Sequence, residues 1–167
     1  MNSYQMAYFK FMTQSREHVF FIFEHIASSD KWNTRINMFM AIASSSSIGA
    51  WVIWQKMSWL WAGVIAVSHV VGVIKTYLPF KKRLSILYTV RNNIEQLCLE
   101  IEKDFFPVFN GDLTEQEIHE KIIAYKTKKL AIEQESLSGT VIPENQSFIA
   151  KAREKNKVYF ENLCIGE

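Results

Sequence analysis

The sequence predicts an all-α membrane protein: a two-helix transmembrane hairpin with a cytoplasmic helical domain built from the N-terminal helix and the C-terminal helices. Between Ile36 and Ile74 only Lys56 is charged, whereas 22% of the whole chain is charged. Outside this region, apolar residues recur every three or four positions, which is typical of amphipathic helices. The expected domains are an N-terminal amphipathic helix (1–30), the hairpin (31–78) and a cytoplasmic sensor or oligomerisation domain (79–167).

Two uncharged runs predict the two spans. The first, from Ile36 to Trp54, has 19 residues, and the second extends from Met57 to Ile74 before Pro79. At about 1.5 Å per residue, runs of this length cover the roughly 30 Å hydrocarbon core of a bilayer. The alternative is a buried hairpin in a soluble protein, but 167 residues leave little chain to cover two apolar helices.

The flanking charges predict the orientation of the hairpin. Lysine and arginine residues precede the first run and follow the second, whereas the connecting turn carries only Lys56. Because cytoplasmic flanks carry the excess of positive charge, both termini are expected in the cytoplasm. The flanking residues are Lys31, Arg35, Lys75, Lys81, Lys82 and Arg83.

Small and hydroxyl side chains in the two runs are candidates for a pore or for helix packing. The residues are Ser44, Ser45, Ser47, Gly49, Ser68, His69 and Gly72. Small residues let helices approach closely, while a polar stripe could line a water-filled path. A conducting path would require several copies of the chain, so this hypothesis predicts a homo-oligomer. His69 is expected either to form an interhelical hydrogen bond or to act in gating.

The N-terminal residues follow a helical pattern. Tyr8, Phe11 and Val19 belong to an apolar stripe, and Arg16 is assigned with other charged residues to the rest of the surface. His18 and His25 lie seven residues apart without a third ligand, so core or surface positions are favoured over a metal site.

Three further helices are expected after Pro79. The first covers about 81–106 and is followed by Pro107, the second begins at a capping box formed by Thr114 and Glu117, and the third follows Pro143. Polar side chains on the first of these helices form either a solvated bend or a cluster of donors directed at a ligand or a symmetry mate. Basic side chains on the other two are either solvated or bind phosphate groups or anionic lipid. The candidate ligand-binding residues are Arg91, Asn92, Asn93, Lys126, Lys128, Lys129, Lys151 and Arg153.

The sequence contains no pattern typical of an enzyme. It has no glycine-rich phosphate loop, nucleophile elbow or zinc-ligand spacing, and His119 with Glu120 lacks the second histidine of a metalloprotease helix. Cys98 and Cys164 are expected to be reduced thiols on the cytoplasmic side. No catalytic residue, metal or cofactor is therefore expected.

The order of these elements resembles the SLATT-type two-transmembrane effectors of bacterial conflict systems. The resemblance covers the whole chain, and similar layouts occur among CRISPR-associated membrane effectors that bind cyclic oligoadenylate. It implies an oligomeric effector in the bacterial inner membrane that permeabilises or depolarises the bilayer during phage infection. The implied trigger is a cyclic oligonucleotide or a sensor protein, as in cyclic-nucleotide-signalled (CBASS) defence, and duplex nucleic acid is not expected as a partner.

Two other functions fit the same elements. The chain could be a non-conducting membrane tether or scaffold for a cytoplasmic partner protein, which requires an exposed apolar patch on the helical domain. It could also be a small transporter subunit with His69 as a proton-linked site.

Overall fold

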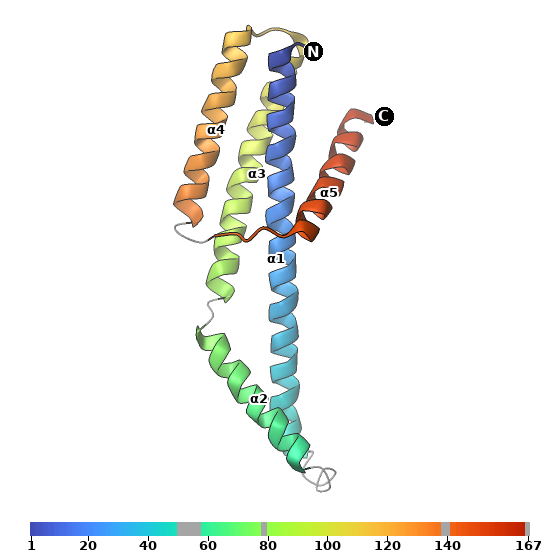
Figure 1. Ribbon diagram of the computed structural model, residues 1–167, viewed down its shortest axis with the longest axis vertical. Coiled ribbons are helices and arrows are strands. Elements are labelled where there is room, and N and C mark those ends of the chain that lie inside the picture. Colours follow the sequence, from blue (N-terminus) through green and yellow to red (C-terminus); the bar gives the residue numbers. More distant parts are fainter. Residues whose placement is uncertain (50–57, 78–79, 138–140, 166–167) are drawn as a thin grey trace. The chain divides into compact units, whose positions relative to one another are not determined.

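The computed structural model describes the backbone of residues 1–49, 58–77, 80–137 and 141–165, and the side chains of 1–42, 59, 62–74, 81–137 and 141–163. These residues form α-helices and no strand (Figure 1). The helices are α1 (Ser3–Gly49), α2 (Ser58–Tyr77), α3 (Phe80–Asn110), α4 (Glu115–Leu137) and α5 (Gln146–Ile165). The all-helical class is therefore confirmed. The chain divides into unit 1 (Met1–Ile26 with Ser85–Glu167) and unit 2 (Ala27–Leu84).

The predicted transmembrane hairpin is wrong for the described residues. Among them, no helix combines the length and the apolar composition needed to cross a bilayer. The first apolar run is the end of a 47-residue helix whose preceding turns carry Asp30, Lys31 and Arg35, and the run continues beyond the described part of the chain. The second run forms a 20-residue helix that contains Ser68 and His69. Counting uncharged residues therefore overestimated how apolar the described parts of both runs are.

Unit 1 is an antiparallel bundle of α3, α4, α5 and residues 3–26 of α1. Contacts between α1 and α3 pair Gln5 with the carbonyl oxygen of Val108 near one end, and place the Arg91 guanidinium over the Phe23 ring near the other. The α5 helix runs antiparallel to α1, as the ring contact between Phe9 and Phe160 indicates together with the contact of Phe148 with His25 nearer the start of α5.

An aromatic and aliphatic core holds this bundle together. Tyr8 and Ile101 are fully buried, and the Tyr8 hydroxyl donates a hydrogen bond to the Ile101 carbonyl oxygen at 3.0 Å. This bond satisfies the polar end of a side chain whose ring packs against Phe105 and Tyr125. The core consists of Tyr8, Phe11, Met12, Leu97, Ile101, Val108, Ile118, Ile122, Tyr125 and Phe160.

The predicted capping box at the start of α4 is confirmed. The Glu117 amide donates to the Thr114 hydroxyl oxygen at 3.3 Å, and the Glu117 carboxylate accepts a hydrogen bond from the Thr114 amide at 2.7 Å. These bonds satisfy amides that have no partner within the helix. Hydrogen bonding to Thr114 also lowers the pKa of the Glu117 carboxyl group.

The end of α3 lies four residues beyond the predicted end. Pro107 is inside the last turn, and the helix closes at Gly111, whose φ of 81° suits a residue without a side chain. The Gly111 amide donates to the Val108 carbonyl oxygen, and the Asp112 amide donates to the Pro107 carbonyl oxygen. This is a Schellman motif, which satisfies the carbonyl groups at the end of the helix.

Unit 2 contains a closely packed seam between α1 and α2. Among the described side chains of α2, the half-buried ones are Val64, Ser68, Val71 and Gly72, and their three- and four-residue spacing places them on one side of the helix. A Cβ atom added at Gly72 would lie 3.6 Å from Cε of Met40, so this glycine is in van der Waals range of α1. The small side chains therefore lie where the two helices approach.

Replacing Ile101 by alanine tests the core. Ile101 is fully buried, so Ile101→Ala should lower the free energy of unfolding by about 2–5 kcal/mol. Urea unfolding of the full chain measures this loss. The matched control is Ile123→Ala on α4, whose side chain is exposed and which should cost less than about 0.5 kcal/mol. Equal losses for both variants would contradict the proposed core.

Candidate functional site

A buried arginine lies at the centre of unit 1. Arg16 of α1 is only 4% exposed, and its guanidinium donates to the Glu102 carboxylate of α3 at 2.6 and 3.0 Å. Glu95 lies 3.9 Å from a third guanidinium nitrogen. Burial alone would lower the pKa of Arg16, but the bonds to Glu102 raise it above its ordinary value. The charge is therefore retained inside the bundle.

Tyr159 brings α5 into the same cluster. Its ring lies under the Arg16 guanidinium at 4.6 Å, and its hydroxyl donates to the Glu102 carboxylate at 2.9 Å. Arg16 thus connects α1, α3 and α5, which is a structural role. Its assignment to the polar surface was wrong, and its position was a signal, because it lies four residues after Met12 and three before Val19, both of which are buried.

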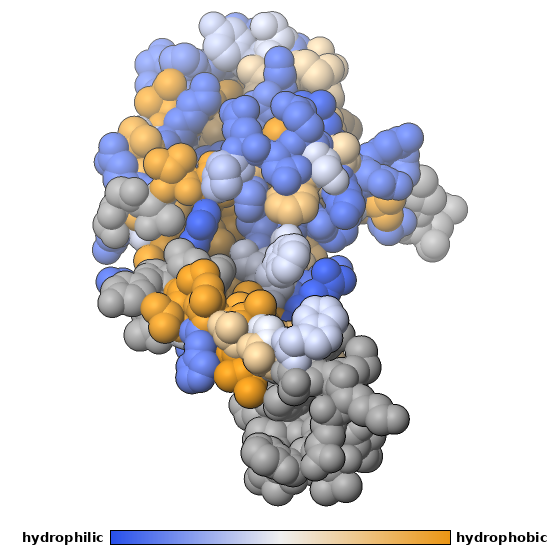
Figure 2. All heavy atoms as spheres, turned by 60° about the horizontal axis from the view of Figure 1, so that its bottom comes forward, coloured by the Kyte–Doolittle hydropathy of each residue, from blue (hydrophilic) through white to orange (hydrophobic). Residues whose placement is uncertain are grey.

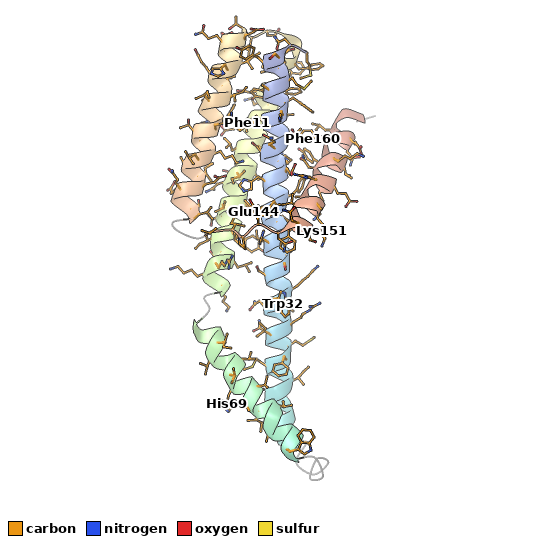
Figure 3. The ribbon with its side chains drawn as sticks, in the orientation of Figure 1. Phe11, Trp32, His69, Glu144, Lys151 and Phe160 are labelled. Carbon is orange, nitrogen blue, oxygen red and sulfur yellow. The ribbon has the colours of Figure 1, made fainter. Side chains whose placement is uncertain are left out.

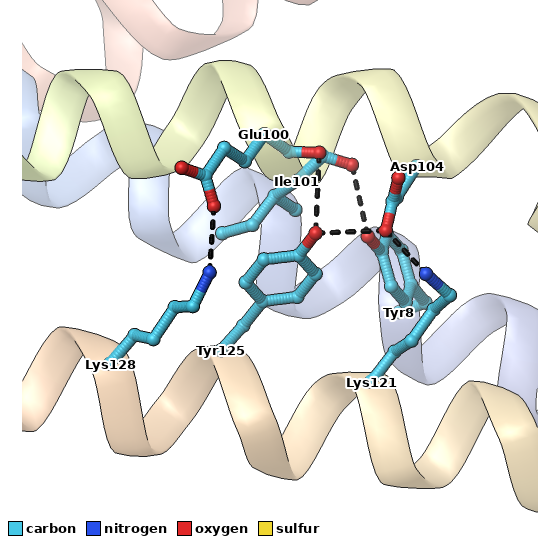
Figure 4. A network of polar contacts seen from close by, with 7 residues as sticks. All are labelled: Tyr8, Glu100, Ile101, Asp104, Lys121, Tyr125 and Lys128. Carbon is cyan, nitrogen blue, oxygen red and sulfur yellow. Dashed lines mark hydrogen bonds and ion pairs between the residues drawn. The ribbon is translucent and has the colours of Figure 1, made fainter.

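A second polar network connects α3 and α4 (Figure 4). The Asp104 carboxylate accepts hydrogen bonds from Lys121 at 2.5 Å and from the Tyr125 hydroxyl at 2.8 Å, and Lys128 pairs with Glu100 at 3.0 Å. Burial raises the pKa of Asp104, but these two hydrogen bonds outweigh it and the net shift is downward. The network therefore contains an ionised carboxylate at pH 7.

The candidate ligand residues on α3 are mostly engaged within the bundle. Arg91 pairs with Glu95 at 2.8 Å and lies over the Phe23 ring at 5.6 Å. Its Nε atom is buried and has no hydrogen-bond partner among the described residues. Asn92 is exposed and Asn93 is half-buried. These three residues do not present a cluster of donors to the solvent.

The candidate basic residues on α4 and α5 form no common site. Lys128 pairs with Glu100, and Arg153 pairs with Glu17 at 3.1 Å. Lys126 lies over the Phe11 ring at 5.9 Å, whereas Lys151 is exposed on α5 (Figure 3). Neighbouring acids therefore neutralise two of the side chains that the sequence assigned to phosphate binding.

Lys129, the remaining candidate, lies in a partly buried group with His18, Glu133 and Cys98. Burial lowers the pKa of Lys129. Burial and the Lys129 charge lower the pKa of His18 to about 4, although Glu133 lies 3.3 Å from its Nδ1 atom. His18 is therefore neutral at pH 7. Burial also raises the pKa of the Cys98 thiol to about 11, so this cysteine is protonated and unreactive at pH 7.

His18 also lines a groove between α1 and α5. The groove has a volume of about 370 Å³, and the Glu17–Arg153 ion pair lies along it. Its lining residues are Gln14, Glu17, His18, Phe21, Glu144, Ile149 and Arg153. Except for Arg153, these residues were not identified as binding residues from the sequence, because they come from segments more than 120 positions apart. The groove offers hydrogen-bonding groups and one aromatic ring, but no activated nucleophile.

The candidate pore residues are only partly described. Ser44, Ser45, Ser47 and Gly49 lie outside the described side chains. The Ser68 hydroxyl donates to the Val64 carbonyl oxygen of its own helix at 2.7 Å. This bond satisfies the hydroxyl group within α2.

His69 lies on the exposed side of α2 (Figure 3). Its side chain forms no interhelical hydrogen bond with the described residues of unit 2.

Exposed large apolar side chains are denser on unit 2 than on unit 1, because ten of the 23 in the described residues lie on this smaller unit. On the face shown in Figure 2, hydrophobic side chains gather over this unit. Trp59 is 74% exposed and Val70 is 57% exposed. We define the apolar surface of unit 2 as Met38, Phe39, Ile42, Trp59, Ile65, Val67, Val70, Val73 and Ile74. Full burial of each such side chain is worth about 1.5–3 kcal/mol, so covering this surface would be favourable.

The described residues contain no group of three or more histidine, cysteine or acidic side chains that could hold a metal ion. Comparison of the chain with protein-family models, with curated proteins and with solved structures finds no significant match. The apolar surface of unit 2 is therefore the feature from which a function is inferred.

Removing the buried charge tests the Arg16 cluster. Arg16→Met should lower the free energy of unfolding by about 3–5 kcal/mol, because the partly buried Glu102 carboxylate would lose its charged partner. Urea unfolding measures the loss. Adding Glu102→Gln should recover part of it by removing the unpaired carboxylate. Arg153→Met, at an exposed ion pair, is the control and should cost less than about 1 kcal/mol. Equal costs for the two arginine variants would contradict the structural role of Arg16.

The lowered pKa of His18 predicts a pH dependence of stability. Between pH 6.5 and about 4, the unfolded histidine binds a proton that the folded one does not, so stability should fall as pH falls through this window. The loss should reach about 3 kcal/mol at most. Unfolding measured across the window should show a flatter profile for His18→Asn, with exposed His119→Asn as the control. An unchanged profile for His18→Asn would refute the assignment.

Proposed function

We propose that this protein is a membrane-associated helical effector that contacts the bacterial inner membrane through the apolar surface of unit 2. The observation that carries the proposal is the density of exposed large apolar side chains on unit 2: ten of the 23 in the described residues lie on this smaller unit. The proposed contact lies in the interfacial layer of the bilayer, where an apolar surface can bury itself without any helix crossing the membrane.

Two exposed tryptophans favour lipid as the environment that covers the apolar surface of unit 2. Trp32 is 60% exposed on α1, and Trp59 is exposed near the start of α2. Tryptophan is favoured at the boundary between headgroups and acyl chains, because its ring is largely apolar while its N–H group can reach water. The exposed apolar residues Ile65, Val67 and Val70 cover a wide arc of α2. Such an arc fits contact with an extended surface such as a membrane.

In this proposal unit 1 is the regulatory part of the effector. The trigger stays a prediction, as do oligomerisation and a role in antiphage defence. The ion pairs of Lys128 and Arg153 disfavour these two side chains as cyclic-oligonucleotide contacts, because a phosphate group would have to compete with Glu100 and Glu17. A sensor protein, or a small ligand in the groove between α1 and α5, agrees better with these contacts.

A membrane tether for a partner protein is the second candidate function. Unit 1 also exposes large apolar side chains, among them Leu99 and Phe106 on α3 and Leu130 on α4. Such side chains could contact a partner protein while unit 2 holds the complex at the membrane. A tether would bind vesicles without disturbing them, whereas an effector would release their contents.

Vesicle flotation combined with dye release tests these functions. The full chain should float with lipid vesicles and release an enclosed dye, while the variant Val70→Ser, Val73→Ser, Ile74→Ser should bind at least tenfold more weakly, because three exposed apolar contacts are lost. The matched control, Leu99→Ser, Ile123→Ser, Leu130→Ser, changes exposed positions of unit 1 and should bind normally. Binding without dye release would favour the tether, and no binding by the full chain would refute membrane association.

A further inference from the structure

Charge is divided unequally between the two units. Unit 2 contains one acidic residue, Asp30, and seven basic residues: Lys31, Arg35, Lys56, Lys75, Lys81, Lys82 and Arg83. Seven positive charges and one negative charge give unit 2 a formal charge of +6 at pH 7. Since the whole chain carries +2, unit 1 carries −4. The most apolar unit is therefore also the cationic one.

The basic residues of unit 2 that the structure describes are concentrated on two neighbouring segments. Ser29 and Asn33 of α1 line a small recess together with Lys81 and Leu84 of α3. This recess places residues 29–33 beside residues 81–84. We use the name collar for the exposed side chains of these segments and the following turn of α1: Lys31, Trp32, Arg35, Lys81, Lys82 and Arg83.

The collar differs in its contacts from most basic residues of unit 1, where seven of the twelve lysines and arginines form ion pairs. In unit 1, Lys121, Lys128 and Arg153 pair with acidic side chains of other helices. Within the described residues of unit 2, none of the five basic collar side chains forms an ion pair. Arg35 instead lies over the Trp32 ring at 5.8 Å. The positive charge of the collar is therefore available to an external anion.

The collar continues into the apolar surface along α1. Met38, Phe39 and Ile42 follow Arg35 on the same helix and are exposed. Lysine, arginine and tryptophan side chains next to apolar ones match the layering of a bilayer, in which charged headgroups lie beside acyl chains.

We propose that the collar is a binding surface for the headgroups of anionic phospholipids. This inference rests on the proposed membrane association and adds the class of lipid. The phosphate groups of anionic lipids would accept hydrogen bonds from the collar lysines and arginines, while the apolar surface enters the adjoining layer. A nucleic acid would use the charge but leave the apolar side chains in water. Face-to-face pairing of two copies through unit 2 would bring like charges together.

Binding to vesicles of defined composition tests the collar. The full chain is titrated with neutral phosphatidylcholine vesicles and with vesicles that also contain anionic phosphatidylglycerol. The variant Lys81→Gln, Lys82→Gln, Arg83→Gln should bind the anionic vesicles roughly 100-fold more weakly, at about fivefold per cation, and the neutral vesicles almost as before. Added salt should reduce this difference, because it screens charges at the surface.

The matched control removes the same number of exposed positive charges from unit 1, as Lys103→Gln, Lys126→Gln, Lys151→Gln, and should bind anionic vesicles within a few-fold of the natural chain. Equal binding of the natural chain to both vesicle types, with no effect of the collar variant, would overturn the headgroup surface but leave membrane association in place. Binding to neither vesicle type would overturn both proposals. Tighter binding to a single-stranded oligonucleotide than to anionic vesicles, or collar-dependent dimerisation without vesicle binding, would overturn the lipid assignment.

Discussion

The ion pair between Arg16 and Glu102 is the interaction on which the arrangement of unit 1 depends. A guanidinium that is 4% exposed has lost most of its water, so its charge must be neutralised by groups held at fixed positions. Glu102 comes from α3, and Tyr159 of α5 contacts both members of the pair. Shifting α1 or α3 by one turn would separate the two charges, and shifting α5 would remove the contacts of Tyr159 with both. The pair therefore fixes their register, while the surrounding aromatic core supplies most of the apolar burial.

The two units differ in net charge and in how many of their basic side chains are paired, and this difference connects the fold with the proposed function. Unit 1 is acidic overall, and its basic side chains at positions 121, 128 and 153 are paired with acids of neighbouring helices. Unit 2 keeps its collar unpaired and its large apolar side chains exposed. Water solvates the charges of such a surface but not its apolar side chains. An anionic membrane surface can satisfy both features together.

The sequence predicted the local structure of unit 1 better than its contacts. The Thr114–Glu117 capping box is a short-range pattern and could be found directly. The partners of Arg16 could not be found in this way, because they lie 79 or more positions away and a charged residue is ordinarily exposed. For the same reason Lys128 was assigned to a ligand when its contact is Glu100 of a neighbouring helix. In unit 2, counting uncharged residues predicted spans but could not show where α1 begins and ends.

Hydrogen–deuterium exchange of the full chain, with and without anionic vesicles, tests the central claim that unit 2 is the membrane-contacting part and unit 1 is not. Burial of the apolar surface and collar should slow amide exchange across residues 27–42, 62–74 and 81–84. Exchange in α4 and in residues 87–110 of α3 should stay unchanged. Slower exchange confined to the bundle, or no change in either unit while the protein is bound to the vesicles, would contradict the claim.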